Sequence, residues 1–344
     1  MSPSGYHQCP QRWTVRAYRR PLRPPLQTAH GLWPQREGLI VRRVDEQGQV
    51  SFGEIAPLPW FGTETQAQAQ AFCAQWGAGF LSAAIAAIPD TLPACQFGLG
   101  TALSGWPLAG AESANAPQGA DPPLAIAAAD ICALLPGGKA ALTAWEPLWA
   151  KGHRTFKWKI GVASVAQELP IFQALVSALP REARLRLDAN GGLSPAAAAA
   201  WLAACDRYFP QIEFLEQPLP PATILDWWTT VGERFQTAIA LDESVATLGQ
   251  LRQVHQQVGD RVVYVVKPAI AGFPDQLAQF CQAQRLDVVF SSALETPIGR
   301  NAAVAIAQSL WAAGVPRRAL GFGVGHWFAD DWDTLSEVDL WQRL

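Results

Sequence analysis

The second part of the chain repeats one pattern, in which a short apolar run is followed by a longer segment that can form a helix. The runs cover residues 131–135, 156–161, 184–190, 212–218, 238–244, 262–268, 287–292 and 319–323. Between them, Ser194 and Pro195 are typical of a helix N-terminus, and Ser164 with Gln167 has the spacing of a capping box. Eight strands alternating with helices predict an α/β fold and favour a closed parallel barrel over an open sheet.

The first part of the chain has a different pattern. Residues 38–59 alternate apolar and polar positions around a turn at residues 45–48, which predicts an antiparallel hairpin. Alanine-rich segments at residues 65–76 and 80–88 predict helices, so this part is expected to be an α+β unit. Residues 104–123 are rich in Pro, Gly, Ala and Ser and read as a linker or a long surface loop between the two parts.

The overall composition limits the kinds of protein that this chain can be. With 344 residues, the chain is long enough for one large α/β domain and a smaller companion. A net charge of −3 without any basic run argues against a nucleic-acid partner. The absence of a signal-peptide pattern and of an apolar run of about 18 residues predicts a soluble, cytoplasmic protein without a membrane anchor. Six cysteines without a CxxC pair indicate reduced thiols.

Polar residues close six consecutive apolar runs. They follow one another at intervals of 24 to 29 residues, close to one strand plus one helix with its loops. In order, they are Lys159, Asp188, Glu216, Asp242, Lys267 and the pair Ser291 and Ser292. We expect them at the same level of the barrel, on the face formed by the C-terminal strand ends, where barrel enzymes carry their active sites. Any one of the carboxylates alone is equally compatible with helix capping.

The charges in this set point to a cation. Burying three carboxylates and two amines together costs many kcal/mol unless they are paired or coordinate an ion. Asp188, Glu216 and Asp242 offer only oxygen ligands, which suit Mg²⁺, and the lack of Cys and His at these positions argues against zinc or copper.

Lysine is rare in this chain, with five lysines against 21 arginines. Unlike arginine, a lysine can be tuned to release its proton. A lysine near a divalent cation and a second ammonium has its charged form disfavoured, so it can act as a base. Lys159 and Lys267 are therefore suited to removing a weakly acidic proton next to a carboxylate.

The ordered motifs KxK (157–159), DAN (188–190), EQP (216–218), DES (242–244) and KP (267–268) resemble the muconate-lactonizing subgroup of the enolase superfamily, in which a lysine base and Mg²⁺ are an established pairing. Residues 53–65 and 96–103 look like its capping domain. GEIAPLP (53–59), ALLPG (133–137) and FSSALET (290–296) are most similar to the o-succinylbenzoate synthases. The resemblance implies an α+β capping domain at residues 1–118, a (β/α)7β-type barrel at 119–325, and a C-terminal segment at 326–344 that returns to the cap.

The resemblance also implies an activity. Members of this family are hydro-lyases that use Mg²⁺, with Mn²⁺ as a possible substitute. They convert 2-succinyl-6-hydroxy-2,4-cyclohexadiene-1-carboxylate to 2-succinylbenzoate by syn dehydration through an enediolate, a step of menaquinone or phylloquinone synthesis. By position, Lys159 would be the base and then the acid, Lys267 would stabilise the enediolate, and Asp188, Glu216 and Asp242 would bind the metal.

Further residues are assigned on the same resemblance. Lys157, Arg186 and Asn190 would support the metal ligands. The small-molecule carboxylate substrate would be held by hydroxyl and backbone N–H groups of Ser291, Ser292, Gly299, Arg300 and Asn301. Cap loops around residues 27–31 and 60–63 would cover the pocket and exclude water. Gln217 departs from the family pattern, since many relatives have a second glutamate there.

Other functions remain open on the same scaffold. Two lysines on opposite sides of a site also suit an N-acylamino acid racemase, a dipeptide epimerase or a cycloisomerase. Dipeptide epimerases usually have an Asp-x-Asp after the seventh strand, whereas this chain has the single acid Glu295 there, which favours the dehydratase. A binding or structural module that has lost catalysis is disfavoured because all five proposed catalytic and metal-binding residues are present.

Overall fold

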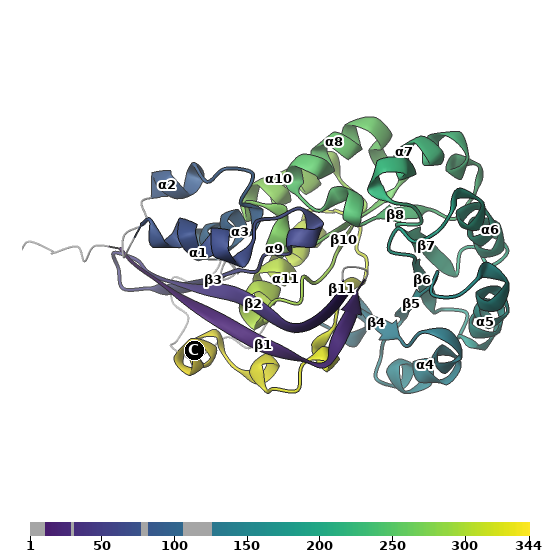
Figure 1. Ribbon diagram of the computed structural model, residues 1–344, viewed down its shortest axis with the longest axis horizontal. Helices are drawn as coiled ribbons and strands as arrows, with labels where there is room; N and C mark the ends of the chain where they lie inside the picture. The colour runs from purple at the N-terminus through teal and green to yellow at the C-terminus, as the bar shows by residue number, and fades with distance from the viewer. Residues whose placement is uncertain (1–10, 29–30, 77–81, 106–125) are drawn as a thin grey trace, which may run out of the picture.

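A computed structural model describes residues 11–28, 31–76, 82–105 and 126–344. It has two parts, a cap of three strands with helices and a barrel with surrounding helices, which lie side by side in Figure 1. The predicted linker and the predicted domain limit at residue 118 fall mostly or wholly outside the described residues, as does part of the loop at 27–31. Within the described ranges, no helix is both long and apolar enough to cross a bilayer.

The barrel is built from eight parallel strands, which confirms the predicted fold. The strands are β4 (Ile131–Leu135), β5 (Thr155–Lys159), β6 (Arg184–Asp188), β7 (Ile212–Glu216), β8 (Ile239–Leu241), β9 (Val263–Val266), β10 (Val288–Phe290) and β11 (Leu320–Gly323). They pair in the order β10-β9-β8-β7-β6-β5-β4-β11. A parallel bridge between Ser291 and Gly321 joins the two end strands and closes the ring.

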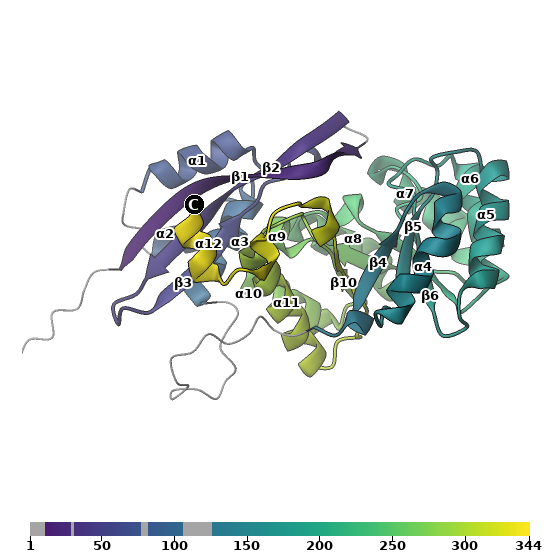
Figure 2. The same cartoon turned by 90° about the horizontal axis from the view of Figure 1, so that it is seen from below.

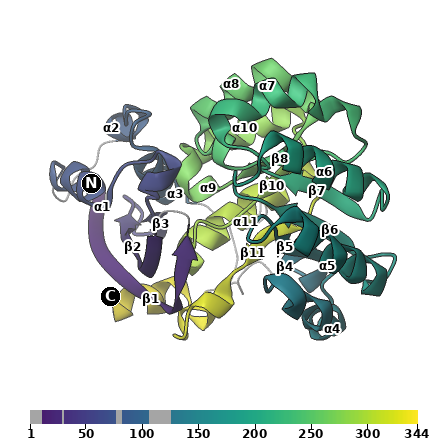
Figure 3. The same cartoon turned by 45° about the vertical axis from the view of Figure 1, so that its right-hand side comes forward.

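Helices cover the outside of this ring, as Figure 3 shows. They are α4 (Ala141–Ala150), α5 (Val165–Ala178), α6 (Pro195–Asp206), α7 (Pro221–Thr230), α8 (Leu248–Val258), α9 (Pro268–Ala271), α10 (Pro274–Gln284) and α11 (Pro297–Ala312). The predicted helix starts are confirmed, because the Ser194 hydroxyl accepts the Ala197 N–H and Ser164 forms a capping box with Gln167.

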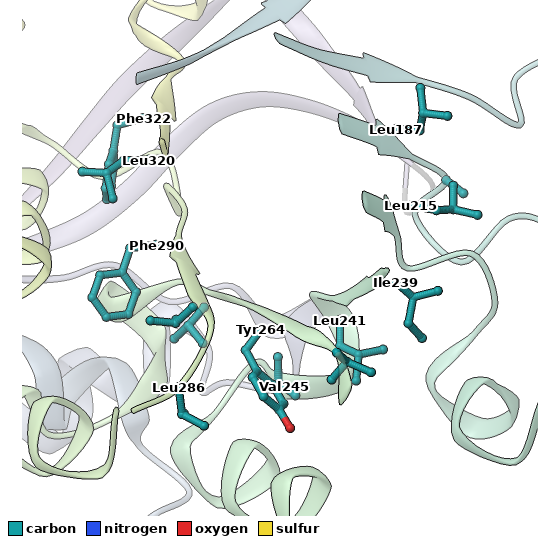
Figure 4. Close-up of a cluster of buried hydrophobic side chains, with 14 of the residues drawn as sticks. Leu187, Leu215, Ile239, Leu241, Val245, Tyr264, Leu286, Phe290, Leu320 and Phe322 are labelled. Atoms are coloured by element: carbon teal, nitrogen blue, oxygen red, sulfur yellow. The ribbon is translucent and has the colours of Figure 1, made fainter. Parts of the chain in front are cut away.

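The side chains of each barrel strand alternate between the helices and the interior. Leu187, Leu215 and Phe290 belong to the large apolar cluster between strands and helices, and they point away from the ring in Figure 4. A strand has a side-chain period of two, so Lys157 and Lys159, like Arg186 and Asp188, share the opposite, inward face. The outward face supplies the core, and the inward face carries the polar residues of the site.

The cap contains a three-stranded antiparallel sheet, β1 (Arg12–Thr28), β2 (Gly31–Val44) and β3 (Val50–Ile55), and the helices α1 (Gln66–Ala74), α2 (Ser82–Ala86) and α3 (Pro93–Ser104). The hairpin predicted around residues 45–48 is β2–β3. Strand β1 escaped prediction because arginine and proline are frequent in it, a composition that only an edge strand tolerates. The β1–β2 hairpin extends toward the barrel (Figure 2).

The C-terminal segment packs against the cap. Its helix α12 (Glu337–Arg343) places Leu340 and Trp341 in a cluster with Tyr18 and Phe52, and the Arg16 side chain donates to the Trp341 carbonyl at 2.7 Å. Short 3-10 helices complete the chain at Pro59–Phe61, Ala128–Asp130, Gly138–Ala140, Gly232–Arg234, Glu243–Val245, Gly259–Arg261, Gly325–Trp327 and Trp332–Thr334.

Candidate active site

The register of the barrel strands brings the predicted ligands together. Lys159 pairs with Asp188 across β5 and β6, and Asp188 pairs with Glu216 across β6 and β7. Asp242 directly follows β8, and Lys267 directly follows β9. These five residues therefore lie at neighbouring C-terminal strand ends. Strands β5 and β9 are separated by three strands in either direction around the ring, so the two lysines stand on opposite sides.

Lys157 forms ion pairs with two of the carboxylates. Its Nζ lies 2.8 Å from Asp188 Oδ2 and 2.8 Å from Glu216 Oε1, although its Cα is one layer deeper than theirs. Burial opposes ionisation of Asp188, but the Lys157 ammonium outweighs it and holds the pKa of Asp188 below its ordinary value. Burial, followed by the charge of Asp188, raises the pKa of Glu216 to about 8. One ammonium therefore does not compensate both carboxylates.

Asp242 is held by two other residues. It forms a short ion pair with Lys267, and its backbone N–H donates to Gln217 Oε1 at 3.0 Å. Gln217 is fully buried, has a positive φ of 36°, and donates through Nε2 to the Ser244 hydroxyl at 2.8 Å. The position where many relatives have a glutamate thus anchors the turn that presents Asp242. This role of Gln217 was not predicted from the sequence. The only sequence feature that could have indicated it is the position of Gln217 directly after Glu216.

Asn190 connects two sides of the site. Its backbone N–H donates to Asp188 Oδ1 at 3.0 Å, and its Nδ2 lies 3.3 Å from both Asp188 Oδ2 and Glu243 Oε1. The residue has a φ of 42°, a left-handed conformation that asparagine tolerates better than most residues. Asn190 therefore lies beside the predicted metal ligand Asp188, where the sequence placed it. Glu243 is a further carboxylate at the site that sequence reasoning did not assign.

The charge at these strand ends fits a bound divalent cation. Glu243 Oε2 is buried without a hydrogen-bond partner, and burial, followed by the charge of Asp242, raises the pKa of Glu243 to about 7. In the described ranges, no three acidic, His or Cys side chains already converge as a ligand cluster, because the carboxylates of Asp188, Glu216 and Asp242 turn toward lysines. An excess of buried carboxylate oxygens suits Mg²⁺, which prefers oxygen ligands.

The two proposed catalytic lysines have different surroundings. Lys159 is exposed, and its ammonium has no hydrogen bond or ion pair to any described residue. Lys267 is buried, and beyond its pairing with Asp242 its Nζ lies 4.2 Å from the centre of the Phe61 ring, in the cap. The cap loop predicted at residues 60–63 therefore reaches the site.

Arg186 lies one layer below the ligands. Its guanidinium donates to Glu213 at 2.7 and 3.3 Å and lies 5.0 Å from the centre of the Phe214 ring. Arg318 binds the same Glu213, so these charges form a network toward the N-terminal ends of the strands. Arg186 thus supports the barrel interior beneath the site and does not contact the Asp188 carboxylate with a hydrogen bond.

The loop after β10 is organised by Glu295. Its carboxylate accepts the Ser292 hydroxyl at 3.0 and 3.1 Å and the Ala293 N–H at 2.6 Å, and burial raises its pKa to about 7. Ser291 lies on the same loop, where its N–H donates to the Val266 carbonyl. The Glu295 carboxylate is therefore hydrogen-bonded within its own loop. One of its partners is the Ser292 hydroxyl, which was predicted to hold the substrate.

The start of helix α11 corrects a prediction. The Gly299 N–H, expected to bind a substrate carboxylate, donates to Glu54 of the cap at 3.0 Å. Arg300 pairs with Asp333 at 3.1 Å, and the Asn301 side chain hydrogen-bonds Glu337 of the C-terminal helix. These three residues face the cap and the C-terminal segment, so the helix N-terminus is already filled by a carboxylate of the protein itself.

Two cavities lie at the other end of the barrel. They have volumes of about 370 and 520 Å³ and share the ion pair between Arg317 and Asp130 in their walls. The larger one is also lined by Arg318 and by Asp287 and Glu213, both of which form ion pairs with Arg318. Charges at the N-terminal face of such barrels serve stability, and none of the proposed catalytic residues lines these cavities.

Comparison with known proteins agrees with this geometry. Family models match residues 12–106, as the MenC N-terminal domain, and residues 140–334, as an enolase C-terminal domain-like unit. An o-succinylbenzoate synthase of Thermosynechococcus vestitus is 42% identical over 97% of this chain and 99% of its own length.

Solved structures give the same result. An o-succinylbenzoate synthase from Thermosynechococcus elongatus, crystallised with Mg in its active site, has a TM-score of 0.82 at 40% identity and covers 97% of this chain and 100% of its own. The L-Ala-D/L-Glu epimerase of Bacillus subtilis has a TM-score of 0.72 at 20% identity, covers 93% of this chain and 91% of its own, and shares the fold. The chain therefore belongs to the o-succinylbenzoate synthase family of the enolase superfamily.

Proposed function

We propose that this chain is an o-succinylbenzoate synthase, a Mg²⁺-dependent hydro-lyase that converts 2-succinyl-6-hydroxy-2,4-cyclohexadiene-1-carboxylate to 2-succinylbenzoate. The observation that carries the residue assignment is the strand register, which aligns Lys159, Asp188 and Glu216 at one level, with Lys267 on the opposite side of the ring. The reaction places this chain in menaquinone or phylloquinone synthesis. A cytoplasmic location and the lack of a nucleic-acid partner stay predictions from the sequence.

Lys159 acts twice on the same face of the substrate. As a free amine, its Nζ removes the proton from the carbon next to the substrate carboxylate, and the electron pair moves into that carboxylate to give an enediolate. The pair then returns to form the new ring double bond while the C–O bond to the hydroxyl breaks. Lys159 returns the proton to the departing hydroxyl, which leaves as water. Its ammonium forms no hydrogen bond or ion pair with the part of the chain that the structure describes, which suits both steps.

Lys267 supplies a fixed positive charge on the other side. Its ion pair with Asp242 and its contact with the Phe61 ring hold the ammonium at the end of β9, where negative charge develops on the substrate. Since the side chain is buried, this charge acts in surroundings with little water, where it is worth more than in solution.

Asp188, Glu216 and Asp242 would hold the Mg²⁺, with Mn²⁺ as a possible substitute. When bound, the ion would hold the substrate carboxylate and stabilise the negative charge that forms on it. Lys157 pairs with Asp188 and Glu216 and holds both side chains in place, and Gln217 fixes the backbone of Asp242.

The loop after β10 disfavours the epimerase alternative. Holding a substrate ammonium requires a carboxylate directed into the site, and the acid of this loop, Glu295, is buried and bonded to Ser292 and Ala293 instead. The rest of the scaffold supports proton abstraction in either case, so this loop favours a substrate without an ammonium group.

A direct assay tests the proposal. The purified protein with Mg²⁺ is expected to consume the cyclohexadiene acid and to lose activity with EDTA. Lys159→Ala and Lys267→Ala are expected to lower kcat by several orders of magnitude, whereas Lys151→Ala, on an exposed lysine at the end of α4, serves as the matched control. Full activity in either active-site variant overturns the mechanism. A higher rate on N-succinylamino acids than on the cyclohexadiene acid overturns the assignment of the reaction.

A further inference from the structure

Phe61 of the cap contacts the proposed catalytic residue Lys267. The Nζ of Lys267 lies over the face of the Phe61 ring, 4.2 Å from its centre. An ammonium at this distance is attracted by the negative face of the ring, and the attraction is larger where water is excluded. Lys267 is buried, with 8% of its surface exposed, so water is largely excluded from this contact.

The loop that carries Phe61 is held rigidly by its own hydrogen bonds. The Phe61 N–H donates to the Leu58 carbonyl at 2.8 Å, and the Leu58 N–H donates to the Thr63 hydroxyl at 2.8 Å. Gly62 ends the short helix with a φ of 85°, a left-handed conformation in which glycine is free of strain. The backbone that carries the Phe61 ring is therefore held in place by the loop.

The cap sheet holds this loop from its other side. Arg36 of β2 donates to the carbonyls of Ala56 and Pro57, and its guanidinium lies 5.7 Å from the centre of the Trp33 ring. Trp33 meets Trp60 edge to face, with 4.8 Å between ring centres. Since Trp60 is next to Phe61, these contacts connect the cap sheet to the ring that touches Lys267.

We propose that Phe61 is a positioning residue for the dehydration, acting through Lys267. This inference rests on the proposed function. Lys267 has a carboxylate partner, Asp242, which attracts the ammonium but also cancels its charge. An aromatic face attracts the ammonium without cancelling the charge, so Phe61 holds Lys267 in place and leaves its charge available to the enediolate.

Phe61 also has a simpler possible role, which is to fill space and exclude water above the site. The two roles differ in what a substitution does. Phe61→Leu keeps an apolar side chain but removes the aromatic face, whereas Phe61→Tyr and Phe61→Trp keep an aromatic face. A space-filling residue tolerates leucine and is disturbed by the larger tryptophan, and a ring that holds a cation shows the reverse order.

The test compares steady-state kinetics of these three variants with the wild type on the cyclohexadiene acid with Mg²⁺. We expect Phe61→Leu to lower kcat by roughly 5- to 30-fold, the loss of one desolvated cation–π contact. KM and the Kd of the product 2-succinylbenzoate are expected to change less than about threefold, and the tyrosine and tryptophan variants to retain kcat within about threefold. Phe280→Leu, on the outer helix α10, is the matched control.

The outcomes separate the two proposals. A wild type without dehydratase activity refutes the proposed function and, with it, this inference. With an active wild type, unchanged kcat in Phe61→Leu overturns the positioning role, and so does a rise in KM or product Kd without a fall in kcat. Equal losses in the leucine, tyrosine and tryptophan variants overturn it as well, since the two variants that keep an aromatic face then lose as much as the one that removes it. Urea unfolding of each variant identifies any loss of activity that comes from misfolding.

Discussion

Replacing Glu54 by glutamine tests how the cap is joined to the barrel. Glu54 is fully buried on β3, and its carboxylate accepts four donors. These are the Tyr18 hydroxyl at 2.5 Å, the Thr296 N–H at 2.9 and 3.0 Å, the Thr296 hydroxyl, and the Gly299 N–H at 3.0 Å. Three of the four donors belong to the start of α11, so one cap carboxylate fills the positive end of a barrel helix.

The size of the effect follows from these bonds. Glutamine has the same shape, and its amide NH₂ can donate to the Tyr18 hydroxyl while its oxygen still accepts from Thr296 and Gly299. Hydrogen bonds to a charged group stabilise a protein by about 1 kcal/mol more than neutral ones, and a negative charge at a helix N-terminus adds up to about 1 kcal/mol. Relief from burying a charge offsets part of this. We therefore expect Glu54→Gln to lower the free energy of unfolding by about 2 to 4 kcal/mol.

Urea unfolding followed by tryptophan fluorescence measures this loss. Glu46→Gln, the same change at an exposed position in the β2–β3 turn, is the control and is expected to stay within about 0.5 kcal/mol of the wild type. Hydrogen exchange measures the local effect of the substitution. In the variant the amides of Thr296 and Gly299 lose their charged acceptor, so they are expected to exchange faster. A loss below about 1 kcal/mol with unchanged exchange at these two amides refutes the account.

Three further predictions concern the site. Lys157→Met leaves Asp188 and Glu216 without the ammonium that they share. Thermal unfolding in EDTA is expected to show that the free energy of unfolding falls by about 3 to 5 kcal/mol. A variant as stable as the wild type contradicts the pairing. Mg²⁺ at 100 times its Kd should raise the wild-type stability by about 2.7 kcal/mol, and Asp242→Ala should not respond. Burial raises the pKa of Glu295 to about 7 in the folded protein, whereas this residue has a pKa near 4.5 in the unfolded chain. The unfolded chain therefore loses the proton first as the pH rises, and the free energy of unfolding falls between about pH 4.5 and pH 7, by up to about 3 kcal/mol. Glu295→Gln should reduce this dependence of stability on pH.

The barrel could be predicted because its evidence is periodic. Regular spacing of the apolar runs indicates the strands, and equal spacing of their last residues implies that these residues share one level, as the pairing of Lys159 with Asp188 and of Asp188 with Glu216 shows. Strand β1 has no such signal. Its arginines and prolines resemble a loop, and its pairing with β2 over residues 12 to 28 depends on a partner that the local pattern does not contain.

The site could be predicted only where backbone position decides the role. Gln217 and Glu295 act through the reach of their side chains, which spacing along the chain does not encode. The prediction for Gly299 failed for a related reason. A helix N-terminus in a sequence looks free to bind an anion, but the anion in the structure is Glu54, which lies 245 residues earlier in the chain. Contacts between domains of this kind have no local signal.

The cap segment from Glu54 to Phe61 contacts the C-terminal face of the barrel at two neighbouring places. Glu54 lies on β3 and binds the start of α11 after β10, whereas Phe61 follows seven residues later and contacts Lys267 after β9. Strands β9 and β10 are paired neighbours, so both contacts act on one side of the ring. The carboxylate fixes where the segment sits, and the ring depends on that position to meet the ammonium. The cap is therefore joined to the barrel at two adjoining strand ends, one of which carries the proposed catalytic residue Lys267.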